Sequence, residues 1–282
     1  MPWRTLGAVA PTELVDARLQ LHHAAQVVAS AGVTFLEPRP DDGHPNFGWV
    51  EGLGALVGHR LPGAGARIGL RVGQPAWIVV DADGSIRDEL GLDGRTLEDG
   101  YAWLAEATAA AGAKPPSAGR RRAAYEIPDH ATARGARFAC VPAEAFVELA
   151  GWFANGQLSL DALAARSPGA SEVRCWPHHF DLGALLTLAP GPEGAPDRSI
   201  GVGLSPGDAD YAEPYAYVSP WPYPKPGALP TLRGGGRWHT EGHTSAVLTA
   251  SELLAGPTGR QAERLRGFLD TASDASRRLL GG

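Results

Sequence analysis

Apolar residues recur every three to four positions in four segments of the chain, which is the period of an amphipathic helix. The first segment runs from Glu13 to Ser30, with Pro11 and Thr12 before it as start signals and Gly32 after it as a stop. The same period predicts three further helices, over residues 96–111, 142–165 and 259–280. The sequence therefore predicts helices near the beginning, in the middle and at the end of the chain.

Extended segments lie between these helices, and Gly, Pro or Asp residues bound them. Strands are expected over residues 47–57, 66–72, 75–80, 173–189, 199–204, 215–218 and 238–248. The run from Asp81 to Gly84 reads Asp-Ala-Asp-Gly and predicts a hairpin turn. Because the strands cluster between helices instead of alternating with them, we expect an α+β fold with antiparallel sheets and helices on one side.

Composition changes sharply between residues 109 and 122, where alanines, two adjacent prolines and three arginines follow one another. This pattern is typical of a connection between units. We therefore expect an N-terminal α+β half at residues 1–113, a linker at 114–124 and a C-terminal α+β half at 125–282. Both halves run in the order helix, Trp-containing strand, Ile-Gly strand, aromatic strand and closing helix. This order predicts an internal repeat, with two related halves that each form an antiparallel sheet with flanking helices.

The composition narrows the class of protein. Of the 282 residues, 44% are hydrophobic and 20% charged, no apolar run approaches ~18 residues, and no signal-peptide pattern opens the chain. We therefore expect a soluble cytoplasmic protein that does not bind membranes. A net charge of -6 argues against a nucleic-acid partner, which needs clustered Lys and Arg. Cys140 and Cys175 lack a paired spacing, so reduced thiols are expected.

Residues 174–248 contain four of the nine histidines and three of the eight tryptophans, a density that points to a functional site. Within this region His239, Glu241 and His243 alternate with Thr240 and Gly242. In an extended strand the two imidazoles and the carboxylate would share one face. Such a convergence suits a divalent metal such as zinc or iron.

A second element reads Trp-Pro-His-His-Phe-Asp over residues 176–181. If it is extended, Trp176 shares a face with His178, while His179 and Asp181 share the other. A histidine beside a carboxylate has a fixed imidazole tautomer, whether it binds metal or acts as a base. We therefore predict a metal site formed by His179, Asp181, His239 and His243. The alternative is a buried polar network that fixes strand register.

Acids and aromatic residues lie between these two elements. Glu213 directly precedes Pro214 and an aromatic strand, where enclosure would disfavour its charged form, so it is a candidate general acid, with Glu241 as the second. Asp208 follows a Pro-Gly turn signal. The candidate ligand-binding residues are Trp176, Asp208, Tyr215, Tyr217, Trp221 and Trp238. The aromatic residues among them either line a pocket or fill a core.

Several motifs resemble those of the bacterial domain-of-unknown-function family numbered five-nine-nine-six. They include Trp176 with Phe-Asp-Leu at 180–182, Pro-Gly at 206–207, the aromatic strand at 217–224 and the early Leu-His-His at 21–23. Members of that family typically have small residues where this chain has His178 and His179. The resemblance supports the architecture over nearly the full chain and implies no known activity.

The sequence favours a metal-dependent, hydrolase-like enzyme that acts on a small molecule. A divalent metal would acidify water, and Glu213 or Glu241 would move its proton. One alternative is a non-catalytic protein that binds a small-molecule ligand in an aromatic pocket. Another is a structural or interaction protein, with an aromatic patch that forms a homo-oligomer. The sequence leaves these three functions open.

Overall fold

The computed structural model describes residues 2–117, 119–191 and 196–281. Its contacts divide the chain into two compact units. We call Glu13–Ala150 with Cys175–Phe180 the N-terminal unit, and Met1–Thr12, Gly151–Arg174 and Asp181–Gly282 the C-terminal unit. The chain thus leaves and re-enters each unit, so the units are not simply the two halves of the sequence.

The expected linker at 114–124 does not separate the two units. Its final residues dock on helix α1 (Val15–Phe35): Arg121 N donates to Thr34 Oγ1 at 3.0 Å, and Ala123 N donates to Ser30 Oγ at 2.9 Å. The chain instead passes between units inside helix α3 (Ala143–Ala164), after Ala150. The Pro-rich composition therefore marks an extended segment within the N-terminal unit, because its amides find acceptors on a helix.

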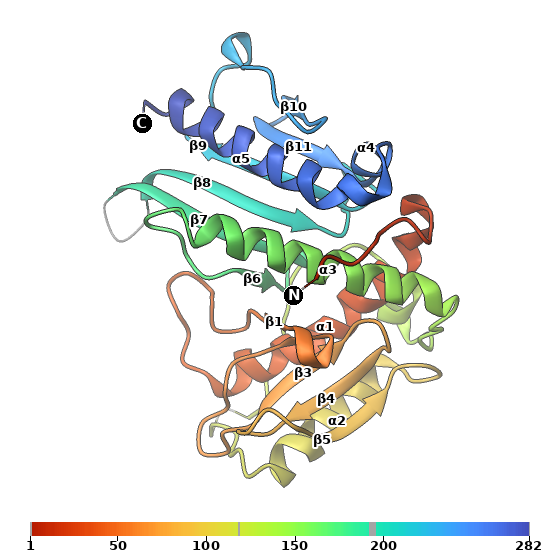
Figure 1. Cartoon of the computed structure of the whole chain (residues 1–282). Coiled ribbons are helices and arrows are strands. Elements are labelled where there is room, and N and C mark those ends of the chain that lie inside the picture. The colour runs from red at the N-terminus through yellow and green to blue at the C-terminus, as the bar shows by residue number, and fades with distance from the viewer. Residues whose placement is uncertain (1, 118, 192–195, 282) are drawn as a thin grey trace. The chain divides into compact units, whose positions relative to one another are not determined.

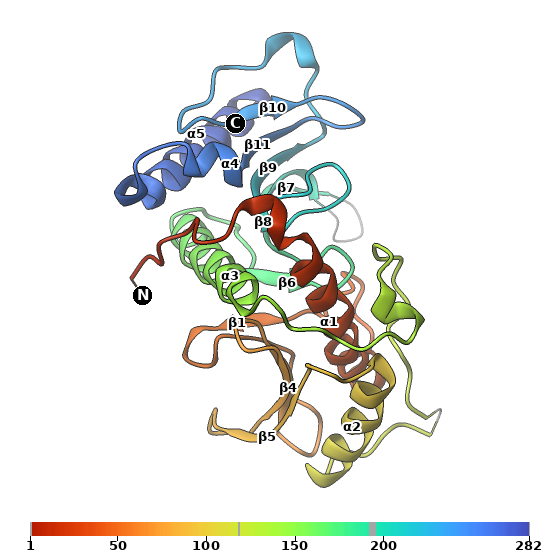
Figure 2. The ribbon, with the colours of Figure 1, turned by 90° about the vertical axis from the view of Figure 1, so that its right-hand side faces the viewer.

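The N-terminal unit contains α1, a five-stranded antiparallel sheet and helix α2 (Leu97–Ala110). Its strands follow chain order: β1 (Gly48–Val50), β2 (Ala55–Val57), β3 (Arg67–Arg71), β4 (Ala76–Val80) and β5 (Ile86–Gly91). Helix α1 packs on β3 and beside α2 (Figure 2). The fully buried Trp77 on β4 joins the layers, since its Nε1 donates to Ala24 O on α1 at 2.9 Å.

The C-terminal unit contains part of α3, a six-stranded antiparallel sheet and two further helices. Its strands are β7 (Asp181–Pro190), β8 (Pro196–Ser205), β9 (Tyr215–Trp221), β10 (Arg237–His239) and β11 (Ser245–Thr249), and its helices are α4 (Ala250–Leu254) and α5 (Gln261–Leu279). Of the edge strand β6 (Arg174–Trp176), only Arg174 belongs to this unit, and the other two residues belong to the N-terminal unit. The strand order is β10-β11-β9-β8-β7-β6. Helix α5 lies along one face of this sheet (Figure 1), where Ala216 and Val218 of β9 are buried. Tyr215 and Tyr217 point to the other face and are partly exposed.

The two antiparallel sheets confirm the predicted α+β fold. Each unit also shows the order helix, antiparallel sheet, helix, while the internal duplication stays a prediction. No helix in the described part of the chain is long and apolar enough to cross a membrane. Both cysteines, Cys140 and Cys175, are free thiols.

Candidate functional site

The predicted metal ligands are distributed over both units. His179 belongs to the N-terminal unit, whereas Asp181, His239 and His243 belong to the C-terminal unit. The rings of His239 and His243 lie side by side, with centroids 4.7 Å apart. Among the described residues, no group of three or more His, Cys, Asp or Glu side chains is arranged to hold a metal ion. The four-residue metal site therefore stays a prediction.

The motif at 176–181 is not the continuous strand that we expected. Residues 177–180 form a turn, in which the amides of His179 and Phe180 both donate to Trp176 O, at 3.2 and 2.6 Å. Phe180 has a positive φ of 59°, which an L-residue in a strand does not adopt. As a result the rings of His178 and His179, expected on opposite faces, lie with their centroids 4.4 Å apart.

Seven aromatic rings form a continuous row in the C-terminal unit, and three of them, Tyr215, Tyr217 and Trp221, were predicted to bind a ligand. Neighbouring ring centroids along Trp221, Tyr223, His243, His239, Tyr211, Tyr215 and Tyr217 are 4.7–6.2 Å apart. Tyr215 donates to Asp208, and Tyr217 donates to Asp181 Oδ2 at 2.5 Å. Burial, followed by the charge of Asp208, raises the pKa of Tyr215. The row is thus a series of ring contacts, in which two tyrosines also donate to carboxylates.

The remaining predicted residues have structural contacts. Glu213 caps α4, since its Oε2 accepts from the N and the Oγ of Ser251, both at 2.6 Å, and it is only partly buried. The partial enclosure expected of this side chain is found, and its role as a general acid stays a prediction. Glu241 is exposed, and its backbone oxygen accepts from His239 Nε2 at 2.7 Å. Trp238 Nε1 donates to Pro230 O at 2.8 Å.

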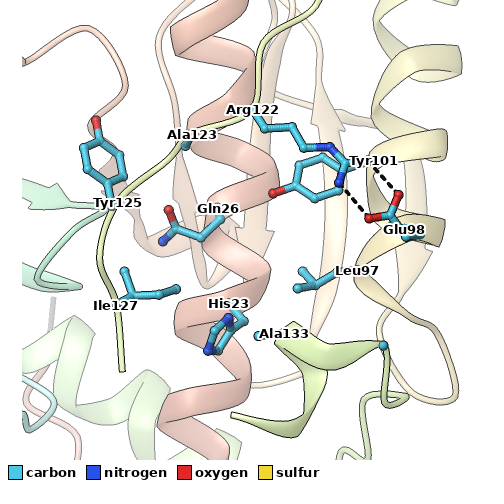
Figure 3. A pocket seen from close by; sticks show the side chains of 11 residues that line it. His23, Gln26, Leu97, Glu98, Tyr101, Arg122, Ala123, Tyr125, Ile127 and Ala133 are labelled. Atoms are coloured by element: carbon cyan, nitrogen blue, oxygen red, sulfur yellow. Dashed lines mark hydrogen bonds and ion pairs between the residues drawn. The ribbon is translucent and has the colours of Figure 1, made fainter. Parts of the chain in front are cut away.

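A pocket of about 260 Å³ lies within the N-terminal unit, and none of the predicted site residues lines it (Figure 3). Its walls come from α1, the start of α2 and the extended segment 122–135. The lining residues are His23, Gln26, Leu97, Glu98, Tyr101, Arg122, Ala123, Tyr125, Ile127, Ala133 and Gly135. The volume is near the lower end of the roughly 300–1,000 Å³ common for ligand pockets.

Gln26 is the most informative residue of this pocket. It projects from α1, is only 6% exposed, and its Nε2 donates to His22 O at 3.1 Å and to Pro177 O at 2.9 Å. These two carbonyls fix which end of the amide is the nitrogen. The other end, Oε1, is buried and has no hydrogen-bond partner among the described residues. A buried acceptor without a partner is costly, so it marks a place where a donor is missing.

Two histidines on α1, His22 and His23, accompany Gln26, and both are buried. His22 Nε2 donates to Pro177 O at 2.9 Å, and its ring stacks on Phe180 with centroids 5.1 Å apart. Burial lowers the pKa of His22 to about 4. His23 Nε2 donates to Pro128 O at 2.9 Å, and burial lowers the pKa of His23 as well. Both rings are therefore neutral at neutral pH.

The opposite wall combines an aromatic ring with an ion pair. The Arg122 guanidinium lies over the Tyr101 ring, 3.9 Å from its centroid, and forms two hydrogen bonds to Glu98 at 2.7 and 2.6 Å (Figure 3). Burial raises the pKa of Tyr101, so its hydroxyl keeps its proton. Tyr125 donates to Asp42 Oδ2 at 3.0 Å. The charges of Glu98 and Arg122 cancel, and the pocket has no net formal charge.

Sequence reasoning missed this pocket, although one signal was present. Gln26 is flanked by two alanines and two valines in α1, and a polar residue between apolar neighbours needs a partner. The predicted motif does contact the pocket: Pro177 O accepts from Gln26, and the His178 ring lies beside Tyr125, with centroids 5.5 Å apart.

Comparisons with protein-family models, with curated proteins and with solved structures found no match to this chain. The resemblance to the family numbered five-nine-nine-six therefore stays a prediction.

Proposed function

We propose that this protein binds a small, uncharged molecule in the pocket of the N-terminal unit, through an N–H or O–H group on the ligand. This is the non-catalytic alternative left open by the sequence, placed at a different site. The free thiols Cys140 and Cys175 support a cytoplasmic location for it.

The buried Oε1 of Gln26 carries the proposal. A ligand donor would satisfy this acceptor, which has no hydrogen-bond partner among the described residues. Leu97 and Ile127 supply apolar walls, and the ring of Tyr101 supplies a flat one. Because Arg122 is already paired with Glu98, a charge on the ligand would add little to its binding free energy. These features favour a neutral aromatic heterocycle with a ring N–H.

Ligand-observed NMR with matched probes tests this proposal. Indole, indazole and benzimidazole would each be compared with the N-methyl derivative, which has nearly the same shape and lacks the donor. We expect at least one N–H compound to bind, and its N-methyl partner to bind more weakly by about fivefold or more, because a lost hydrogen bond to a buried acceptor costs roughly 1–3 kcal/mol. Equal binding within every pair would overturn the role of Gln26.

A substitution at the pocket wall locates the binding. Ala133 is exposed and lines the pocket, so Ala133→Phe should fill the entrance and abolish binding without disturbing a core. Ala131→Phe is the matched control, since Ala131 is an exposed residue of the same short helix (Ala131–Arg134) and does not line the pocket. If both variants bound the heterocycle like the parent protein, the pocket would not be the site.

A second candidate function rests on the adjacent rings of His239 and His243. These imidazoles would bind a zinc or iron ion, which would lower the pKa of a water molecule for the hydrolysis of a small molecule. Glu241, between the two histidines in the sequence, would move the proton of that water. Elemental analysis of protein without a histidine tag tests it, beside a His239→Ala, His243→Ala double variant of unchanged fold. Near-stoichiometric metal in the parent and none in the variant is the expected result. Metal-free parent protein after incubation with either ion would exclude it.

A further inference from the structure

A second cavity, of about 270 Å³, lies in the C-terminal unit. Its walls are Trp3 from the N-terminal segment, Leu158, Ala162 and Arg166 from α3 and the turn after it, and Arg266 and Leu269 from α5. None of these residues was singled out by the sequence patterns. The cavity combines an indole, two leucines and two guanidinium groups.

Two buried side-chain amides hold the indole wall in place. Asn155, 1% exposed, accepts from Arg4 N at 2.9 Å and donates to Arg4 O at 2.7 Å. Gln261, 2% exposed, does the same for Leu6, accepting at 3.1 Å and donating at 2.9 Å. Gln261 Oε1 also accepts from Trp3 Nε1 at 3.3 Å. These hydrogen bonds fix the backbone at Arg4 and Leu6 and hold the Trp3 indole, so a ligand would lose little free energy to the ordering of this ring.

The charge of the cavity is positive. Arg166 forms an ion pair with Asp270, and its Nη1 donates to Ala162 O at 2.8 Å. Arg266 is exposed and makes no hydrogen bond or ion pair to any residue that the structure describes. The pKa of Glu263, one turn away, is lowered chiefly by its hydrogen bonds to Arg260 and only slightly by the charge of Arg266. No acidic residue lines the cavity. A guanidinium without a partner, next to apolar walls, suits a carboxylate on an apolar body.

We propose that this cavity is a second binding site, for an aromatic carboxylate whose ring lies between Trp3 and Leu269 and whose carboxylate contacts Arg266. The proposal is independent of the pocket in the other unit. That pocket has no net charge and offers an acceptor, whereas this cavity is cationic and offers donors. The two sites therefore select opposite ligand chemistry.

Isothermal titration of the full chain with naphthoate tests the proposal, with naphthylmethanol as the uncharged probe of similar shape. We expect naphthoate to bind at least fivefold more tightly than the alcohol. Arg266→Gln should weaken naphthoate binding by about fivefold, the upper range for one partly exposed ion pair, and leave the alcohol unchanged. Arg278→Gln is the control, because Arg278 is an exposed arginine of α5 outside the cavity and its loss changes the net charge equally.

A second pair of variants separates the cavity from general charge effects. Ala162→Trp should fill the cavity and abolish binding, whereas Ala165→Trp, at an exposed neighbouring position outside it, should not. The Ala133→Phe variant of the other pocket should bind naphthoate normally. Equal affinities for acid and alcohol, equal effects of the two arginine variants, or undiminished binding in Ala162→Trp would each overturn the proposal.

Discussion

The phenol ring of Tyr217 on β9 lies across Gly203 of the neighbouring strand β8. The two residues are register partners, and a Cβ at position 203 would come under 3.0 Å from the Tyr217 ring. Gly183 continues the path on β7, where it pairs with Gly203. Because Gly183 and Gly203 have no side chains, the Tyr217 hydroxyl reaches Oδ2 of the buried Asp181.

Gly203→Ala should destabilise the C-terminal unit. The added methyl group would come under 3.0 Å from both the Tyr217 ring and the backbone oxygen of Leu182, and overpacking of this kind costs about 1–3 kcal/mol in free energy of unfolding. Gly201→Ala, two residues earlier on the same face, is the control, because its Cβ would meet nothing closer than 3.8 Å. Urea unfolding of both variants measures the difference, and equal stability would show that Tyr217 does not need the space.

Tyr217→Phe should lower the free energy of unfolding by about 1–3 kcal/mol, since it removes a donor from a buried carboxylate. Tyr223→Phe removes the same hydroxyl from a side chain that is 48% exposed, and its effect should stay within about 0.5 kcal/mol. Chemical denaturation compares the two substitutions. A loss at Tyr223 as large as that at Tyr217 would contradict the role given to Asp181.

The neutral form of His22 makes stability depend on pH. Its pKa is 6.5 in the unfolded chain and about 4 in the folded protein, because burial disfavours the charged ring. Between pH 6.5 and about 4, His22 is therefore protonated in the unfolded state and neutral in the folded state. The free energy of unfolding should fall by up to about 1.4 kcal/mol per pH unit as the pH drops from 6.5 towards 4, and this contribution is fully present above 6.5.

His22→Gln tests this dependence, since glutamine does not titrate. Unfolding followed at a series of pH values should show a smaller slope than in the parent protein. Some slope should persist, because burial also lowers the pKa values of His23 and His178. An unchanged slope would mean that His22 titrates normally in the folded state.

Gln261→Leu should release the N-terminal segment. The variant loses the paired hydrogen bonds to the Leu6 backbone and the contact with Trp3 Nε1, so the Leu6 amide should exchange its hydrogen at least tenfold faster. Hydrogen exchange measured by NMR reads this amide directly. Gln157→Leu is the control, because Gln157 on α3 bonds only to Asp161 and should leave Leu6 protected.

Much of the secondary structure was predictable from local patterns. The helix predicted over 96–111 corresponds to α2, Leu97–Ala110. A capping box between Thr96 and Asp99 sets the start of this helix. The turn at Asp81–Gly84 forms as expected, with Gly84 N donating to Asp81 O at 3.1 Å. Each of these signals lies within a few residues of the feature that it specifies.

The candidate sites were predictable only in part. The predicted residues Tyr215 and Tyr217 do share one face of β9, because strand alternation is local, and Asp208 in the loop before β9 accepts from Tyr215. The turn after Trp176 was not predictable, since Pro177 O is held by Gln26 and His22, about 150 residues away in the chain.

By itself the sequence determined the four long helices, most of the strands and hence the α+β class, because periodicity, caps and turns act over short distances. Tertiary structure alone decided that α3 passes between the two units and that Gln26 lines a pocket with Tyr101 and Arg122. Trp3 likewise meets Arg266 at a cavity only in the folded chain. Cavities are enclosed by side chains far apart in sequence, and no local pattern records which of them will meet.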